Sequence, residues 1–237
     1  MAWTLNRLFA RSEPGLRSGR VRLVVPATRH YEAWSLLRET SRQHLEPFEP
    51  SWSADELSWA AFRRRLKRYR RDWKQGTAAP FLIERAEDGV LLGGVTLTNI
   101  RHGVTQSASL GYWIGLPYIR RGYAREAVGG ALAYAFDRLE LNRVEAACMP
   151  SNRASIAVLE GAGFCQEGLA RRYLKINGVF EDHLLFGRLR QEARRDAENG
   201  AGDRDEQRLE LDGAADASGG RQIGTGPPSI VAEGHAA

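Results

Sequence analysis

Two arginines and a glycine form a turn just before a helix-forming segment. The turn, Arg120 to Ala124, is followed by apolar residues at helical spacing: Ala124, Val128, Ala131, Ala135 and Leu139. The N-terminus of a helix carries unpaired backbone N–H groups, and its dipole favours an anion. Gly122 would let the backbone approach a ligand closely. The turn therefore predicts a site for a phosphate-like anion; the alternative is a solvated basic turn.

A second polar pair lies at the start of the next predicted helix. Asn152 and Ser155 are one helical turn apart, so both side chains can face the same ligand. Asn is also a frequent N-cap residue, and Ser155 can simply support that turn. Both a ligand-binding and a structural role therefore remain open.

Candidates for acid–base chemistry are less distinct. Glu145 and Glu167 fall on predicted strands and could accept a proton directly or through a water, although strand carboxylates are usually solvated. Asp182 and His183 are adjacent on a strand, so at most one faces a given site. No serine lies in a glycine-flanked nucleophile elbow, which argues against a Ser-His-Asp hydrolase.

A strongly basic helix is predicted over residues 56–75. Its apolar face comprises Trp59, Phe62, Leu66, Tyr69 and Trp73, at spacings of 3 and 4 residues. The other faces carry Arg63, Arg64, Arg65, Lys67, Arg68, Arg70, Arg71 and Lys74. Such a surface is either merely solvated or a weak contact for rRNA or an acidic protein.

The elements that would position these residues alternate along the chain. Hydrophobic patterning predicts strands over residues 20–25, 81–86, 90–99, 107–114, 144–149, 164–174 and 180–189. It predicts helices over residues 30–43 and 55–75, after the arginine turn, and from Asn152. This order favours a single α/β domain with a mixed sheet of about seven strands and helices on both faces.

Charge divides the chain into three parts. The 237 residues have a formal net charge of +5, but the segment from Gln191 onward holds 5 basic and 10 acidic residues with almost no aromatic content. This composition cannot bury enough apolar surface to order itself. We therefore expect an N-terminal arm at 1–19, a basic folded domain at 20–190 and a disordered acidic tail at 191–237.

The cysteines and apolar segments narrow the class of protein. Two cysteines, Cys148 and Cys165, cannot form a disulfide framework, and neither has metal-ligand spacing. No segment approaches the roughly 20 apolar residues of a membrane span. We expect a cytoplasmic protein without a structural metal or a membrane anchor, either a monomer or a homodimer.

Three segments carry a resemblance to a known family. RRGYAREA (Arg120 to Ala127) resembles the acyl-CoA pyrophosphate loop of the GNAT acetyltransferases, and PSNRASIAVLEGAGF (Pro150 to Phe164) resembles the helix that follows. The ending EGLARRYLKINGVFEDHLLFGRL resembles the ribosomal-protein alanine N-acetyltransferase branch, the RimJ/RimL type. The loop departs from the family pattern at Ile119, where Gln or Arg is usual.

The resemblance implies a cofactor site and a division of roles. Acetyl-CoA would bind with its pyrophosphate on the amides of Arg120, Arg121, Gly122, Tyr123 and Ala124. A backbone amide near Trp113 and Ile114 would polarise the thioester carbonyl where that strand splays from its neighbour. Asn152 would contact the pantetheine and Ser155 would protonate the leaving thiolate. Glu145 and Glu167 remain candidates for the base.

The acceptor is the least determined part of this hypothesis. The resemblance favours the N-terminal amine of a ribosomal protein, with the LEPFEP loop (Leu45 to Pro50) lining the acceptor end. A small amine, such as a polyamine or aminoglycoside, is the second possibility; the absence of an acidic cluster disfavours polycations. The third is a nucleic-acid-binding module with a degenerate acyl-CoA loop.

Overall fold

One mixed β-sheet runs through the protein. The structure is a computed structural model that describes residues 15–197. Within them the strands are β1 (Leu16–Ser18), β2 (Val21–Val24), β3 (Ala79–Arg85), β4 (Leu91–Arg101), β5 (Ser107–Ile114), β6 (Arg143–Cys148), β7 (Cys165–Ile176) and β8 (Val179–Leu189). Their order is β1-β2-β3-β4-β5-β6-β8-β7. Neighbouring strands are antiparallel, except for the parallel pair β5 and β6.

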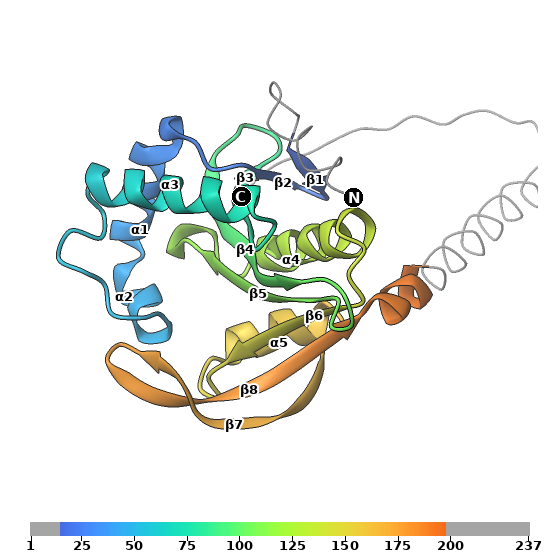
Figure 1. The fold of residues 1–237 in the computed structure, drawn as a ribbon. Coiled ribbons are helices and arrows are strands. Elements are labelled where there is room, and N and C mark those ends of the chain that lie inside the picture. The colour runs from blue at the N-terminus through green and yellow to red at the C-terminus, as the bar shows by residue number, and fades with distance from the viewer. Residues whose placement is uncertain (1–14, 198–237) are drawn as a thin grey trace, which may run out of the picture. The chain divides into compact units, whose positions relative to one another are not determined.

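Helices cover both faces of this sheet (Figure 1). The α-helices are α1 (Tyr31–Thr40), α2 (Arg42–Leu45), α3 (Trp59–Lys74), α4 (Tyr123–Ala133) and α5 (Arg153–Gly161), and a π-helical turn, Tyr134–Arg138, continues α4. Apolar residues of α1 and most of α3 pack on Val24, Leu82 and Leu91. The apolar residues of α4 and α5 pack on the other face of the sheet, against strand side chains that point the opposite way. The fold class is therefore confirmed.

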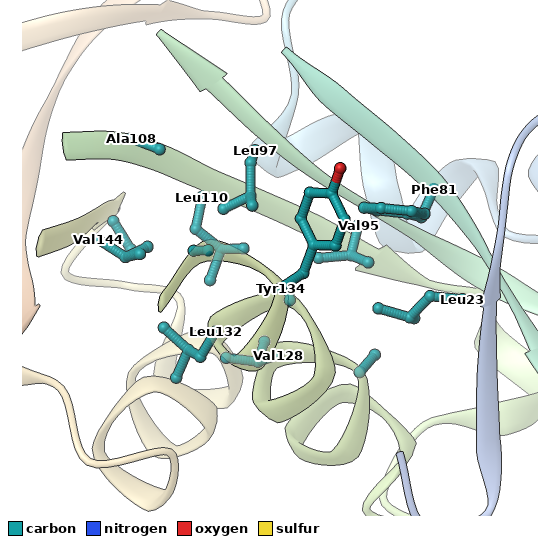
Figure 2. Packing of buried hydrophobic residues seen from close by; sticks show 14 of the residues in the cluster. Leu23, Phe81, Val95, Leu97, Ala108, Leu110, Val128, Leu132, Tyr134 and Val144 are labelled. Atoms are coloured by element: carbon teal, nitrogen blue, oxygen red, sulfur yellow. The ribbon is translucent and has the colours of Figure 1, made fainter. Parts of the chain in front are cut away.

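The larger core lies between α4 and the sheet (Figure 2). Alternate strand residues, such as Val95 and Leu97 on β4, are almost fully buried there against Val128 of α4. Phe81 and Tyr134 pack edge-on, with ring centroids 5.2 Å apart. Because this core fixes α4 against β4 and β5, it also fixes the turn that begins α4.

Most predicted elements are present, but three boundaries differ. β1 lies inside the segment predicted as an arm, and it pairs with β2 across a turn in which Gly19 has a φ of 57°. The helix predicted over residues 30–43 is divided at Ser41, whose hydroxyl accepts the Leu116 N–H at 2.9 Å. The basic helix begins at Trp59 because Ser58 is its N-cap and accepts the Ala61 N–H at 3.1 Å.

The predicted terminal segments are only partly described. Residues 1–14 of the expected arm and 198–237 of the expected acidic tail lie outside the described residues. Residues 190–197 are helical, so helical structure continues past the expected end of the domain at residue 190. Among the residues that the structure describes, no helix is both long and apolar enough to span a membrane.

Candidate active site

Strands β5 and β6 separate part of the way along their length. They pair from Ser107 and Arg143 as far as Leu110 and Ala146, yet β5 continues to Ile114. The Gly115 N–H donates to the Leu92 carbonyl on β4 at 2.9 Å. Since backbone groups of successive strand residues point to opposite sides, Tyr112 and Ile114 direct theirs toward β6. The result is a gap edged by backbone N–H and C=O groups.

The gap distinguishes the two backbone amides, those of Trp113 and Ile114, that were expected to polarise the thioester carbonyl. The Ile114 amide faces the gap, as a group that polarises a carbonyl must. Trp113 is in register with Gly94, so its own amide points into the β4 ladder instead. The side chain of Trp113 lies on the α1 face, where it packs in the smaller core. Any contact between Trp113 and the cofactor therefore has to come from the side chain.

The arginine turn leads directly into the uncapped N-terminus of α4. Gly122 is the N-cap residue with a φ of 82°, and within the described residues the helix has no side-chain cap. Arg120 also has a positive φ, 58°, which is uncommon for a residue with a β-carbon. Turns of this kind, with exposed N–H groups, bind anions. Arg120 and Arg121 are exposed, which leaves their guanidinium groups accessible to phosphate.

A carboxylate in the first turn of α4 is neutralised from outside the helix. Glu126 would repel an anion, but Arg20 donates to it from Nε at 2.8 Å and from its backbone N–H at 2.6 Å. Arg20 also donates from Nη2 to the Arg121 carbonyl at 2.7 Å. The start of β2 is thereby tied to the anion-binding turn. Sequence reasoning missed Arg20 because its partners are about 100 positions away.

A half-buried hydroxyl pair lies on the α4 and α5 side of the gap. The Tyr112 and Ser155 hydroxyl oxygens are 2.9 Å apart, and the Tyr112 hydroxyl is also 3.2 Å from the Ser155 carbonyl oxygen. Burial raises the pKa of the Tyr112 hydroxyl, so it remains a proton donor. Burial also raises the pKa of the Cys148 thiol, which hydrogen-bonds to Ser155. Ser155 therefore meets Tyr112 and Cys148 at the strand gap.

Asn152 begins α5 as its N-cap. Its side-chain oxygen accepts the Ser155 N–H at 3.0 Å, so the structural role considered from the sequence is present. The cap uses only the oxygen of the carboxamide. The amide NH₂ can still donate to a ligand, and a cofactor-binding role for Asn152 stays a prediction.

The two carboxylates considered as bases are both engaged by Arg143. Arg143 donates from Nε to Glu145 at 3.0 Å and from Nη1 to Glu167 at 2.8 Å. Hydrogen bonding from Arg143 lowers the pKa of Glu167, which makes it a weaker base. Glu145 pairs with Ser109, before the strands separate. Both groups lie at the closed end of the gap, where β5 and β6 are still paired.

Asp182 and His183 do not act as one unit. The Asp182 carboxylate accepts the Arg172 N–H at 2.8 Å, and the His183 ring donates from Nδ1 to the Glu181 carbonyl at 3.0 Å. His183 is buried and its ring packs edge-on with Tyr173. These contacts account for both side chains as parts of the β7–β8 hairpin. No three potential metal-ligating side chains gather within the described residues.

Comparison with known proteins identifies the family. Residues 20–165 match the family model of the acetyltransferase (GNAT) domain. The chain belongs to the GNAT acetyltransferase family. It is therefore an acyl-CoA-dependent N-acetyltransferase, with acetyl-CoA as its co-substrate. The uncapped turn at Gly122 and the gap between β5 and β6 suit the pyrophosphate and the pantetheine arm of that molecule.

The chain is similar in sequence or structure to the following three proteins. The chain is 37% identical over 150 residues to the probable N-acetyltransferase YjcK of Bacillus subtilis, covering 63% of this chain and 83% of YjcK. It is 30% identical over 174 residues to the ribosomal protein uS5-alanine N-acetyltransferase of Escherichia coli, covering 73% and 90%. The structure of Mycobacterium smegmatis RimJ in complex with CoA-disulfide superimposes with a TM-score of 0.70 at 34% identity, covering 76% and 89%.

Proposed function

We propose that this GNAT enzyme acetylates the N-terminal α-amine of a protein, an alanine or serine terminus of a ribosomal protein in particular. The observation that carries this proposal is the gap between β5 and β6, with the Tyr112–Ser155 hydroxyl pair on one side and the Arg38–Trp113 contact on the other. The likeness to the uS5-alanine N-acetyltransferase and to RimJ supports the choice of acceptor. A cytoplasmic location follows from that acceptor.

The catalytic roles are divided between the backbone of Ile114 and the hydroxyl group of Ser155. The co-substrate supplies a thioester whose carbonyl carbon is attacked by the neutral amine. The Ile114 N–H is placed to stabilise the developing oxyanion. When the C–S bond breaks, Ser155 donates its proton to the thiolate, the nitrogen releases its extra proton to solvent, and the Ser155 oxygen takes a proton back from solvent. Arg120, Arg121 and the amides of Gly122, Tyr123 and Ala124 hold the pyrophosphate.

Tyr112 fits this scheme as a positioning residue. If the Tyr112 hydroxyl donates to the Ser155 oxygen, the Ser155 proton remains free to point at the leaving sulfur. Because the pKa of Tyr112 is raised by burial, the phenol stays protonated and keeps this role. Ser155 thereby has a fixed donor orientation, which a lone serine on an exposed turn would lack.

One experiment separates the possible acceptors. The full-length enzyme would be incubated with acetyl-CoA and, in parallel, with intact ribosomes, a panel of Ala- and Ser-initiated peptides, and spermidine as the small-amine probe. We expect mass increases of one acetyl group on ribosomal proteins or peptides. Acetylation of spermidine alone would overturn the protein-acceptor proposal. Acetyl-CoA binding without transfer to any of these probes would place the acceptor outside the three classes and would also overturn the proposal.

A further inference from the structure

A buried arginine among tryptophans lies next to the gap, on the α1 face. Arg38 of α1 is only 4% exposed. Its guanidinium pairs with both oxygens of Glu49, at 3.1 and 2.6 Å. The same guanidinium carbon lies 4.3 Å from the ring centre of Trp52 and 5.1 Å from that of Trp113. Burying such a charge is costly unless it is paired, and Glu49 supplies the partner carboxylate.

The cluster and the hydroxyl pair lie on opposite sides of the sheet. Trp113 and Tyr112 are adjacent on β5, so their side chains point to opposite faces. Tyr112 reaches Ser155 on the face of α4 and α5, while Trp113 reaches Arg38 on the face of α1. A pantetheine arm that starts from the α4 turn enters the gap from the first face. That leaves the second face, where Arg38 contacts Trp113 and pairs with Glu49, for the attacking amine.

Glu49 is rigidly held but not saturated. Its Oε2 accepts hydrogen bonds from Arg38 and from Trp52 Nε1, the latter at 2.8 Å. Within residues 15–197 its Oε1 accepts one, from Arg38. A carboxylate has about four acceptor positions. The side chain is 24% exposed, so the remaining position is accessible.

The loop that carries Glu49 is also anchored to the far end of the sheet. The Glu49 carbonyl accepts the Asn177 N–H at 3.0 Å from the turn between β7 and β8. Figure 1 shows α2 beside that turn. The position of Glu49 is therefore fixed from two sides.

We propose that Glu49, fixed by Arg38 and Trp52, binds the ammonium group of the acceptor on its way to the gap. This inference rests on the proposed function and adds the residue that selects its substrate class. The Arg38–Glu49 pair is neutral overall, and Arg42, 5.0 Å from the Trp52 ring, is itself paired with Glu46 and Glu39. Such a site suits a single ammonium group, such as a protein N-terminus, and disfavours a polycation.

The test compares two peptides that differ only in the amine. The CoA-bound full-length enzyme would be titrated calorimetrically with an Ala-initiated hexapeptide and with its des-amino analogue, in which a propionyl group replaces the alanyl group. Because charge-assisted hydrogen bonds are strong, we expect the parent to prefer the amine by about tenfold or more. In Glu49→Gln this preference should fall close to one, with the affinity for the des-amino peptide nearly unchanged.

Control variants distinguish recognition from general damage. Asp55→Asn removes a carboxylate from a surface pair with Arg64 and should keep the parent's preference. If Glu49→Gln is unfolded because Arg38 is left unpaired, Arg38→Met/Glu49→Gln removes both charges and should still lose the preference. A folded variant without Glu49 that keeps the full preference would overturn the inference.

A failure of the proposed function would give a different result. If the parent acetylates no peptide but does acetylate phenethylamine, the protein-acceptor proposal fails while Glu49 can still be judged. Glu49→Gln should then raise the KM for phenethylamine about tenfold or more and leave the KM for acetyl-CoA unchanged. An unchanged phenethylamine KM, or a parent preference for spermidine, would count against the ammonium site.

Discussion

Gly122 is the residue on which the anion-binding turn depends most. A valine at a φ of 82° is strained by about 1–3 kcal/mol, and its side chain would stand where the phosphate approaches. Crowding of the new side chain by the protein itself is a smaller effect. The atom nearest to an added Cβ is Arg20 Nη2 at 3.1 Å, which is the end of a flexible side chain. We expect Gly122→Val to fold but to bind CoA at least tenfold more weakly by calorimetry. Gly129→Ala, where a Cβ meets nothing nearer than 3.9 Å, should leave the affinity unchanged.

Tyr112 and Ser155 can be tested as one unit. Ser155→Ala should lower kcat by roughly 10²–10⁴ with little change in the KM for acetyl-CoA. Tyr112→Phe should lower kcat less, because it removes only the group that orients Ser155. If Tyr112 acts through Ser155, the double variant should be no slower than Ser155→Ala alone. Additive losses in steady-state kinetics would show that the two hydroxyls act independently.

Site residues related by local spacing could be predicted from the sequence, whereas those brought together by tertiary packing could not. Asn152 and Ser155 were predictable as a pair because helical spacing fixes their separation. The partner Tyr112 was not, because it is brought to Ser155 by the packing of α5 on the sheet. Likewise, Glu145 and Glu167 are two of several strand carboxylates in the sequence. Only the structure shows that Arg143 hydrogen-bonds to both.

The basic helix α3 carries most of its unpaired charge on one stripe, and Arg68, which lies off that stripe, stacks on the Tyr69 ring. Arg64 pairs with Asp55, Arg65 with Glu56 and Arg71 with Asp72. A row of exposed cations at helical spacing has no ion pair within the described residues: Arg63, Lys67, Arg70 and Lys74. If α3 contacts rRNA, this row is the surface that does so, because Arg64, Arg65 and Arg71 are paired with carboxylates and Arg68 lies against the Tyr69 ring.

Charge reversal on that stripe gives a selective prediction. Arg63→Glu, Lys67→Glu and Arg70→Glu together should slow acetylation of intact ribosomes far more than of a free peptide, and the difference should close at high salt. The buried face, with Phe62, Leu66 and Trp73, is untouched, so the fold should persist. Equal rates on both substrates at low salt would leave α3 as a solvated surface.

Among the elements, regular periodicity decided what the sequence could predict. The aromatic spacing from Trp59 to Trp73 identified α3, and alternation identified the long central strands. β1 has only three residues, too few for a pattern. The break at Ser41 comes from a hydrogen bond to Leu116, which no local signal reports. The gap between β5 and β6 was expected only through the family resemblance, since strand separation has no composition of its own.

The stability of the whole domain should depend on pH through a histidine that ties α1 to the sheet. His30 is buried, its Nδ1 accepts the Ala27 N–H at 3.0 Å, and its Nε2 lies 3.5 Å from Glu84 on β3. Burial lowers the pKa of His30, with a contribution from Arg29 that outweighs the attraction to Glu84. The unfolded chain therefore binds a proton more readily than the native state does. The stabilising contribution of neutral His30 is present above a pH of about 6.5 and is lost as the pH falls below that value.

We therefore expect the free energy of unfolding, measured in urea, to decrease between pH 7.5 and pH 5.5. His30→Asn removes the titrating group and offers a carboxamide oxygen to the Ala27 N–H. The variant should be less stable than the parent at pH 7.5, because a buried side chain has been shortened, but its stability should change less with pH. The pH slope is the quantity to compare, since the two proteins differ only at residue 30. Parallel curves would show that His30 does not link protonation to unfolding.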